Sequence, residues 1–145
     1  MSVSPIPEGY NVVSPYLIVD DVHQQLEFLK EGLGAEILEE IVLPDGSSMH
    51  GEARVGDSVI MMGKSQEGFS AFTSMIHIYT EDCDAAWQRA IEAGAKPSMP
   101  PQDQFYGNRE GGVIGPCGNH WWFGTRKEVM SKEEMAKRAA VARGQ

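Results

Sequence analysis

Basic residues and cysteines are scarce in this chain of 145 residues. Twelve lysines and arginines stand against 21 aspartates and glutamates, which gives a formal net charge of -9 at pH 7. Nucleic-acid surfaces need a basic face to neutralise phosphates, so we expect no nucleic-acid partner. The two cysteines, Cys83 and Cys117, are too few for a disulfide framework. The acidic excess favours solubility, or attraction of a cationic small molecule.

Long apolar runs are also missing. No stretch is long enough to span a bilayer, and the first residues lack the basic region and apolar core of a signal peptide. We therefore expect a cytoplasmic protein with no membrane partner. The sequence also lacks the motifs of phosphate-binding loops, dinucleotide folds and Ser-His-Asp hydrolases. What remains is an ordinary globular composition, 41% hydrophobic and 23% charged, at the size of a single domain spanning residues 1–145.

The order of predicted strands and helices occurs twice. The first unit covers about 12–62: a strand at 12–19 with Pro15 at an edge or strand start, a helix capped at Asp20 or Asp21, and strands at 35–43, 49–55 and 58–62. A linker follows at 63–72. The second unit covers about 74–125: a strand at 74–80, a helix after Asp82, and strands at 96–99, 111–114 and 120–125.

An offset of about 61 residues relates the two units, since it pairs Gly46 with Gly107 at equivalent turns. Half-buried units that cannot cover their own sheets should pack together. We predict an α+β fold of two paired β-α-β-β-β units whose curled mixed sheets surround a cup. A capping box, with Ser131 three residues before Glu134, predicts a C-terminal helix over about 131–141.

One stretch near the C-terminus resembles a known family. The sequence FYGNR at 105–109 is a turn-rich loop with an arginine, and GPCGNHW at 115–121 leads into three consecutive aromatics. Together they resemble the closing signature of the PhnB-like branch of the glyoxalase/bleomycin-resistance/dioxygenase superfamily, which has the vicinal oxygen chelate fold. Gly115 and Cys117 depart from that signature, which usually has Asp and Phe there. The resemblance implies the same repeat, a C-terminal helix and a homodimer.

Enzymes of this superfamily hold a metal with His and Glu from the first and fourth strands of each unit. The resemblance places those four positions at Ser14, Met61, Met75 and Trp122. Such side chains cannot hold a hard divalent cation, which prefers carboxylate or imidazole ligands. We therefore expect no metal and no other cofactor. Two alternatives are open for His50 and Glu52. They form a relocated metal site with His77 or His120, or they are solvated side chains on an outer face.

Strand alternation extends the inner face of the cup from these positions. The predicted ligand-binding residues are Tyr16, Met61, Met75, His77, Tyr79, Arg109, His120 and Trp122. The resemblance places Arg109 at the mouth of the cup, where it binds a carboxylate or makes a structural ion pair. The other side chains either line a ligand site or fill a core.

The predicted function is metal-independent binding of a small, flat or cationic organic molecule, as in the drug-resistance members. The alternative is a metal-dependent lyase, isomerase or dioxygenase with a relocated metal. The fold hosts both classes, so the sequence leaves open whether the protein is an enzyme.

Overall fold

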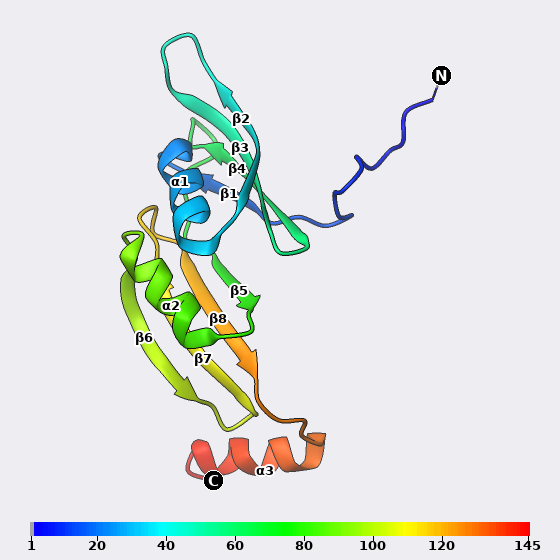
Figure 1. The fold of residues 1–145 in the computed structure, drawn as a ribbon, viewed down its shortest axis with the longest axis vertical. Coiled ribbons are helices and arrows are strands. Elements are labelled where there is room, and N and C mark those ends of the chain that lie inside the picture. Colours follow the sequence, from blue (N-terminus) through cyan, green and yellow to red (C-terminus); the bar gives the residue numbers. More distant parts are fainter. Residues whose placement is uncertain (1) are drawn as a thin grey trace.

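The computed structural model describes residues 2–145 and contains two four-stranded sheets, each covered on one face by a helix (Figure 1). The first unit comprises β1 (Tyr16–Val19), α1 (Val22–Leu33), β2 (Glu36–Val42), β3 (Ser48–Val55) and β4 (Ser58–Lys64). The second comprises β5 (Met75–Tyr79), α2 (Cys83–Glu92), β6 (Lys96–Asp103), β7 (Asn108–Ile114) and β8 (His120–Arg126). The helix α3 (Lys132–Ala142) follows. The predicted α+β fold with two β-α-β-β-β units is confirmed.

The two sheets have the same topology. Their strand orders are β1-β4-β3-β2 and β5-β8-β7-β6. In each sheet the first and fourth strands are parallel neighbours, and the remaining pairs are antiparallel. Tyr16 lies opposite Met61, and His77 lies opposite Trp122. The register therefore repeats with the offset that the sequence predicted.

Polar caps and glycines set the ends of the elements. Asp21 and Asp82 each accept a hydrogen bond from the amide three residues ahead, at 3.0 and 3.1 Å, and begin α1 and α2. The chain leaves α1 through Gly34 with φ 69°, a left-handed conformation that favours glycine. Gly46 and Gly107, at equivalent turns, have φ of 89° and 94°. These signals are local, which is why the sequence revealed them.

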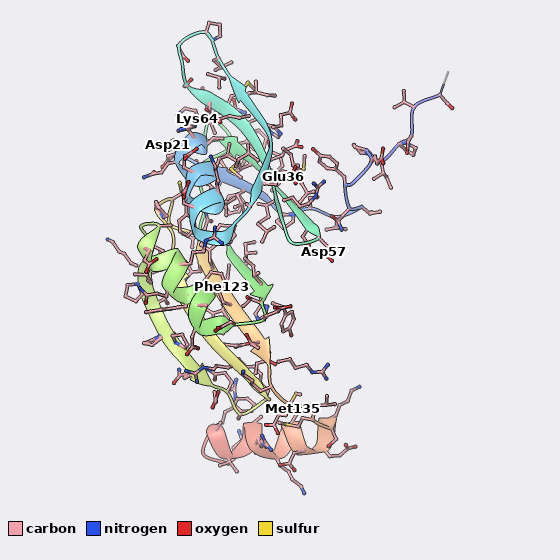
Figure 2. The ribbon with its side chains drawn as sticks, viewed as in Figure 1. Asp21, Glu36, Asp57, Lys64, Phe123 and Met135 are labelled. Atoms are coloured by element: carbon pink, nitrogen blue, oxygen red, sulfur yellow. The ribbon has the colours of Figure 1, made fainter. Side chains whose placement is uncertain are left out.

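The core lies between each helix and its own sheet, and between the two units. Leu26 and Leu29 of α1 are fully buried in the first unit, and Trp121 and Phe123 of β8 are buried in the second. Figure 2 labels Phe123 on β8. Burying side chains of this size stabilises the fold by about 1.5–3 kcal/mol each. The Phe28 ring lies 6.1 Å from that of Trp121 and joins α1 to β8. The opposite face of each sheet has no helix over it.

Three element boundaries differ from the prediction by three residues or more. β1 begins at Tyr16, and residues 12–15 belong to an N-terminal arm, whose outer part projects from the body of the molecule (Figure 1). β6 continues through Pro100 and Pro101 to Asp103, because it is an edge strand with register shifts, where a missing N–H costs no ladder bond. β7 begins at Asn108, so Arg109 lies in a strand and not in a loop.

The C-terminal helix α3 is confirmed, with Ser131 as its N-cap. It lies across the end of the second unit and buries none of its residues (Figure 1). Arg138 holds it in place through hydrogen bonds to the Phe105 carbonyl at 3.3 Å and the Glu128 carboxylate at 2.7 Å. Across residues 2–145, no helix combines the length and apolarity needed to cross a membrane.

Candidate ligand site on the open sheet faces

Five of the predicted ligand residues lie together on the open face of the second sheet. Alternation along β5, β7 and β8 brings them to one side with a glutamate that the sequence did not single out. We call this face the second wall: Met75, His77, Tyr79, Glu110, His120 and Trp122. It contains aromatic and polar groups side by side.

The centre of the second wall is the carboxylate of Glu110, which is 3% exposed. Four donors surround it: the Tyr106 hydroxyl, Asn108 Nδ2 at 3.1 Å, His77 Nε2 at 3.2 Å and Trp122 Nε1 at 3.2 Å. Burial by itself raises the pKa of Glu110, but these hydrogen bonds outweigh it and hold the pKa below its usual value. The carboxylate is therefore ionised at neutral pH, and it orients the side chains around it.

The six-membered ring of the Trp122 indole lies directly against the backbone of Gly112. A Cβ at that glycine would come within 2.1 Å of Trp122 Cζ3 and 2.2 Å of Cε3. The hydrogen bond from Nε1 to Glu110 fixes one edge of the ring. Beside it, the His77 ring meets the edge of Tyr79, with centroids 4.7 Å apart. The result is a preorganised aromatic surface.

The first sheet has an open face of different chemistry, the first wall: Glu39, His50, Glu52 and Met61, with Tyr16 of β1 and Tyr10 of the N-terminal arm. Glu52 is 6% exposed and accepts hydrogen bonds from the Tyr10 hydroxyl and from His50 Nε2 at 2.8 Å. Burial raises the pKa of Glu52, and the bonds from His50 and Tyr10 outweigh it, so the pKa is lowered. The first wall is therefore anionic.

Two cavities reach these walls. The arm and the first wall enclose about 570 Å³, lined by Tyr10, Ser14, Glu39, Glu52 and Met61 among others. A larger hollow of about 860 Å³ lies between the two units, and His77 and Tyr79 at the edge of the second wall reach it. Both are of a size that suits small organic ligands.

Arg109 is not part of either wall. It is the neighbour of Glu110 along β7, so it points to the opposite, helix-covered face of the sheet. Its guanidinium binds both carboxylate oxygens of Asp84 in α2, at 2.7 and 3.1 Å, and Asp103 at 3.2 Å. The structure thus places Arg109 in an ion-pair network against α2 and away from the mouth of the cup.

The remaining predicted residues form two groups. Tyr16 and Met61 lie on the first wall, and the other five lie on the second. Within residues 2–145, no hydrogen bond or ring contact joins the side chains of one wall to those of the other. In a single chain the two walls are therefore separate surfaces.

The four positions that the family resemblance assigns to metal ligands do not fit a metal. They supply a hydroxyl from Ser14, thioethers from Met61 and Met75, and the indole of Trp122. An indole nitrogen only donates, and that of Trp122 already donates to Glu110. This donor set offers no carboxylate, imidazole or thiolate to replace the water around a divalent ion.

Sequence reasoning missed three residues of the walls, Tyr10, Glu39 and Glu110, and it also missed Tyr106, which donates to Glu110. Tyr10 and Glu39 meet their partners through long-range pairing, which leaves no local signal. Glu110 did have one, since it stands two residues before Gly112 and shares its strand face. The predicted strand began at Gly111, and this late start left Glu110 in a loop.

Comparisons with known proteins agree with the fold. The model of the Glyoxalase/Bleomycin resistance protein/Dioxygenase superfamily matches residues 10–123. The chain is 30% identical over 134 residues to the uncharacterized protein Mb0911c of Mycobacterium bovis, covering 85% of this chain and 88% of that protein. It is equally similar to Rv0887c of Mycobacterium tuberculosis, with 79% of that protein covered.

Two solved structures share the architecture. TioX from Micromonospora sp. ML1 superposes with a TM-score of 0.70 at 20% identity, covering 80% of this chain and 98% of that one. A glyoxalase/bleomycin resistance protein/dioxygenase from Nocardioides gives a TM-score of 0.64 at 20% identity, covering 90% of each chain. At these identities the likeness concerns the fold alone.

Proposed function

The chain belongs to the Glyoxalase/Bleomycin resistance protein/Dioxygenase superfamily, and from this premise we propose that it binds a small, flat or cationic organic molecule on the second wall. No metal is needed at the four strand positions discussed above. The observation that carries the proposal is the indole of Trp122, which lies against Gly112 and is held there by its hydrogen bond to Glu110. A ring that is already fixed loses little conformational freedom when a ligand stacks on it.

The electrostatics of the second wall favour a cation. Aromatic faces attract cations, and Trp is the strongest of them. The ionised Glu110 lies at the edge of the Trp122 ring, and among residues 2–145 its ion-pair partner is His77, not a lysine or arginine. The formal net charge of -9 adds a long-range attraction for positive ligands.

Homodimerisation is part of the proposal, because the walls of one chain stay open. Tyr16, Met75 and Tyr79 are 46%, 61% and 69% exposed. A second copy that sets its first wall opposite this second wall would cover these side chains and complete the cup, and closed two-fold pairs are the commonest oligomers. Light scattering at micromolar concentration should give the mass of a dimer. The mass of a monomer would contradict this part.

The ligand proposal is tested by a thermal-shift screen of flat aromatic cations and aromatic antibiotics, followed by titration calorimetry on each hit. A ligand raises the melting temperature through linkage. Trp122→Ala should weaken binding of a hit roughly five- to thirtyfold, because stacking and cation–π contacts of this kind contribute about 1–2 kcal/mol. Phe69→Ala, an exposed aromatic in the linker, is the control and should bind normally. Unchanged affinity in Trp122→Ala would remove the proposal.

A second candidate is a metal-dependent lyase, isomerase or dioxygenase. One observation favours it: Glu39, His50 and Glu52 of the first wall each offer a ligand atom, and these atoms lie within 4.8 Å of one another. Ligand binding that persists after treatment with a chelator would favour the first candidate, and ligand binding that requires a divalent metal would favour the second. A cytoplasmic location also belongs to the proposal, and the two free thiols, Cys83 and Cys117, favour a reducing compartment.

A further inference from the structure

We infer that Glu39, His50 and Glu52 bind one divalent transition-metal ion on the first wall. This site is separate from the Trp122 platform, and it uses none of the four positions that the family resemblance assigns to metal ligands. It therefore goes beyond the proposed function, and either proposal can fail while the other holds.

The register of the first sheet builds the site. Glu39 of β2 lies directly opposite Glu52 of β3, and His50 is two residues before Glu52 on the same face. His50 Nε2 and Glu52 Oε2 are 2.8 Å apart, and the three candidate ligand atoms lie within 4.8 Å of one another. Metal–ligand bonds of about 2.0–2.2 Å put neighbouring ligand atoms roughly 3–3.5 Å apart in a tetrahedral site. Small side-chain rotations reach that geometry.

The charges at this place lack a matching cation. Like charges directly opposite each other destabilise a sheet. Within residues 2–145, neither Glu39 nor Glu52 forms an ion pair with a lysine or arginine. Arg54 lies two residues from Glu52 on β3, but it donates its hydrogen bonds elsewhere, to Glu36 at 3.1 Å and to the Gly9 carbonyl at 3.2 Å. A divalent ion would neutralise both carboxylates at once.

The two tyrosines act as a supporting layer. The hydroxyl of Tyr16 lies 3.1 Å from His50 Nδ1, the ring nitrogen that faces away from the carboxylates. With a metal on Nε2, the imidazole proton sits on Nδ1 and the Tyr16 oxygen accepts it, which is the usual arrangement around a ligating histidine. Tyr10 donates to Glu52 Oε1 and leaves Oε2 turned toward His50. Both contacts fix the ligands in orientation.

The donor set selects the class of metal and leaves room for a ligand. One imidazole with two carboxylates suits zinc, manganese, iron, cobalt or nickel better than magnesium or calcium, which prefer oxygen alone. Glu39 and Glu52 also line the cavity of about 570 Å³ beneath the N-terminal arm. Three protein ligands beside a cavity match an ion with an open coordination position, as in catalytic sites.

The test is cobalt binding to the full chain after treatment with a chelator. Cobalt(II) is followed by its visible absorption and by titration calorimetry, and zinc by elemental analysis after dialysis. We expect one ion per chain in the unchanged protein. His50→Ala and Glu39→Gln should each bind at least tenfold more weakly, and Tyr16→Phe should show a smaller loss. Glu39 is exposed, so its variant should fold normally.

His23→Ala is the matched control. His23 also bonds a glutamate of the first unit, Glu40, at 2.8 Å, but this pair has no second carboxylate among its partners. Its removal should leave cobalt binding unchanged. Trp122→Ala should keep cobalt as well and lose only the organic ligand. Stoichiometry near zero in the unchanged protein, or equal affinity in His50→Ala and Glu39→Gln, would overturn the inference.

Discussion

Replacing Gly112 by alanine tests whether the Trp122 ring is held where the structure places it. The new methyl carbon would stand 2.1 Å from Trp122 Cζ3 and 2.2 Å from Cε3. Non-bonded carbons need about 3.5 Å, so the ring must move by at least about 1 Å. Gly112 has no left-handed φ, which means that the substitution adds bulk without straining the backbone.

The expected cost follows from that movement. Overpacking of this kind destabilises by about 1–3 kcal/mol. The hydrogen bond from Trp122 Nε1 to Glu110 is already 3.2 Å long, so a shift of this size breaks it. A bond to a charged acceptor contributes about 1.5–3 kcal/mol, part of which water recovers because Trp122 is only half-buried. We expect Gly112→Ala to lose about 2–4 kcal/mol, or roughly 10 °C in melting temperature.

Urea unfolding measures the loss of stability, and titration with a hit from the ligand screen measures the effect on the second wall. Gly111→Ala is the matched control, because the neighbouring residue points to the other face of β7. Its Cβ would meet Trp87 at 3.0 Å and Pro101 at 3.1 Å, contacts that a shift of a few tenths of an ångström relieves. We expect it to cost about 1 kcal/mol and to bind the ligand normally.

The result that refutes this reasoning is specific. If Gly112→Ala binds the ligand as the unchanged protein does and unfolds at the same urea concentration, Trp122 does not rest on Gly112. Should Gly111→Ala lose ligand binding instead, the two faces of β7 have been assigned the wrong way round.

Three further predictions concern single groups. The pKa of Glu110 is lowered in the folded protein, so its ionised form stabilises the fold above the ordinary carboxyl pKa, and this contribution is lost as the pH falls through the lowered value. Glu110→Gln should therefore be less stable than the unchanged protein at pH 7 in urea unfolding. The difference in free energy of unfolding between the two proteins should narrow at pH 3. Burial beside Asp21 raises the pKa of Cys117 to about 11, so iodoacetamide at pH 8 should label it on the order of a hundredfold more slowly than free cysteine; mass spectrometry showing equal rates would contradict this. Ser131→Ala removes the hydrogen bond that the Glu134 amide donates to Ser131 at 3.1 Å, and it should destabilise α3 by about 1 kcal/mol. Hydrogen exchange should then be roughly fivefold faster in α3, with little change in the overall melting temperature.

The fold was predictable because its signals are local. Each unit begins its helix at an aspartate N-cap and turns at glycines with positive φ, and Asp21, Asp82, Gly34, Gly46 and Gly107 all take those roles. The sequence also showed the same order twice, which limits the possible architectures. The predicted strand at 96–99 ended too early because it stopped before Pro100 and Pro101. A proline ends a central strand but is tolerated in an edge strand, and the sequence alone does not tell which strand lies at the edge.

The sites were less predictable because they depend on which strands are neighbours. Glu39 and Glu52 are 13 residues apart and meet only through the register of β2 and β3. Tyr10 reaches Glu52 across 42 residues, from an arm that the sequence marked only as a lead-in. Alternation did identify the second wall, since His77 and Trp122 face the same way. Arg109 had been placed at the mouth of the cup by the family resemblance and not by alternation, because the predicted strand began at Gly111, three residues after the observed start at Asn108.

A glycine of the fourth strand links the first and third strands of each unit. In the first unit a Cβ on Gly63 would lie 2.8 Å from the Tyr16 hydroxyl, and in the second a Cβ on Gly124 would lie 3.0 Å from His77 Nε2. Both side chains therefore cross the fourth strand where it has no side chain, and both reach the third strand. The residues they meet, His50 and Glu110, stand directly opposite these glycines.

The two units share this crossing of the fourth strand at a glycine, but they differ in the side chains that meet there. In both units a side chain of the first strand lies over the glycine of the fourth strand, so this contact is a feature of the repeated β-α-β-β-β unit. The pairs that use it differ: tyrosine with histidine in the first unit, histidine with glutamate in the second. The first pairing leaves His50 Nε2 directed at carboxylates, which suits a cation. In the second, the imidazole and an indole share one carboxylate, which fixes an aromatic surface. Two copies of one scaffold thus present walls of different chemistry, and a dimer that sets one against the other would place a metal and a stacked ligand in the same cup.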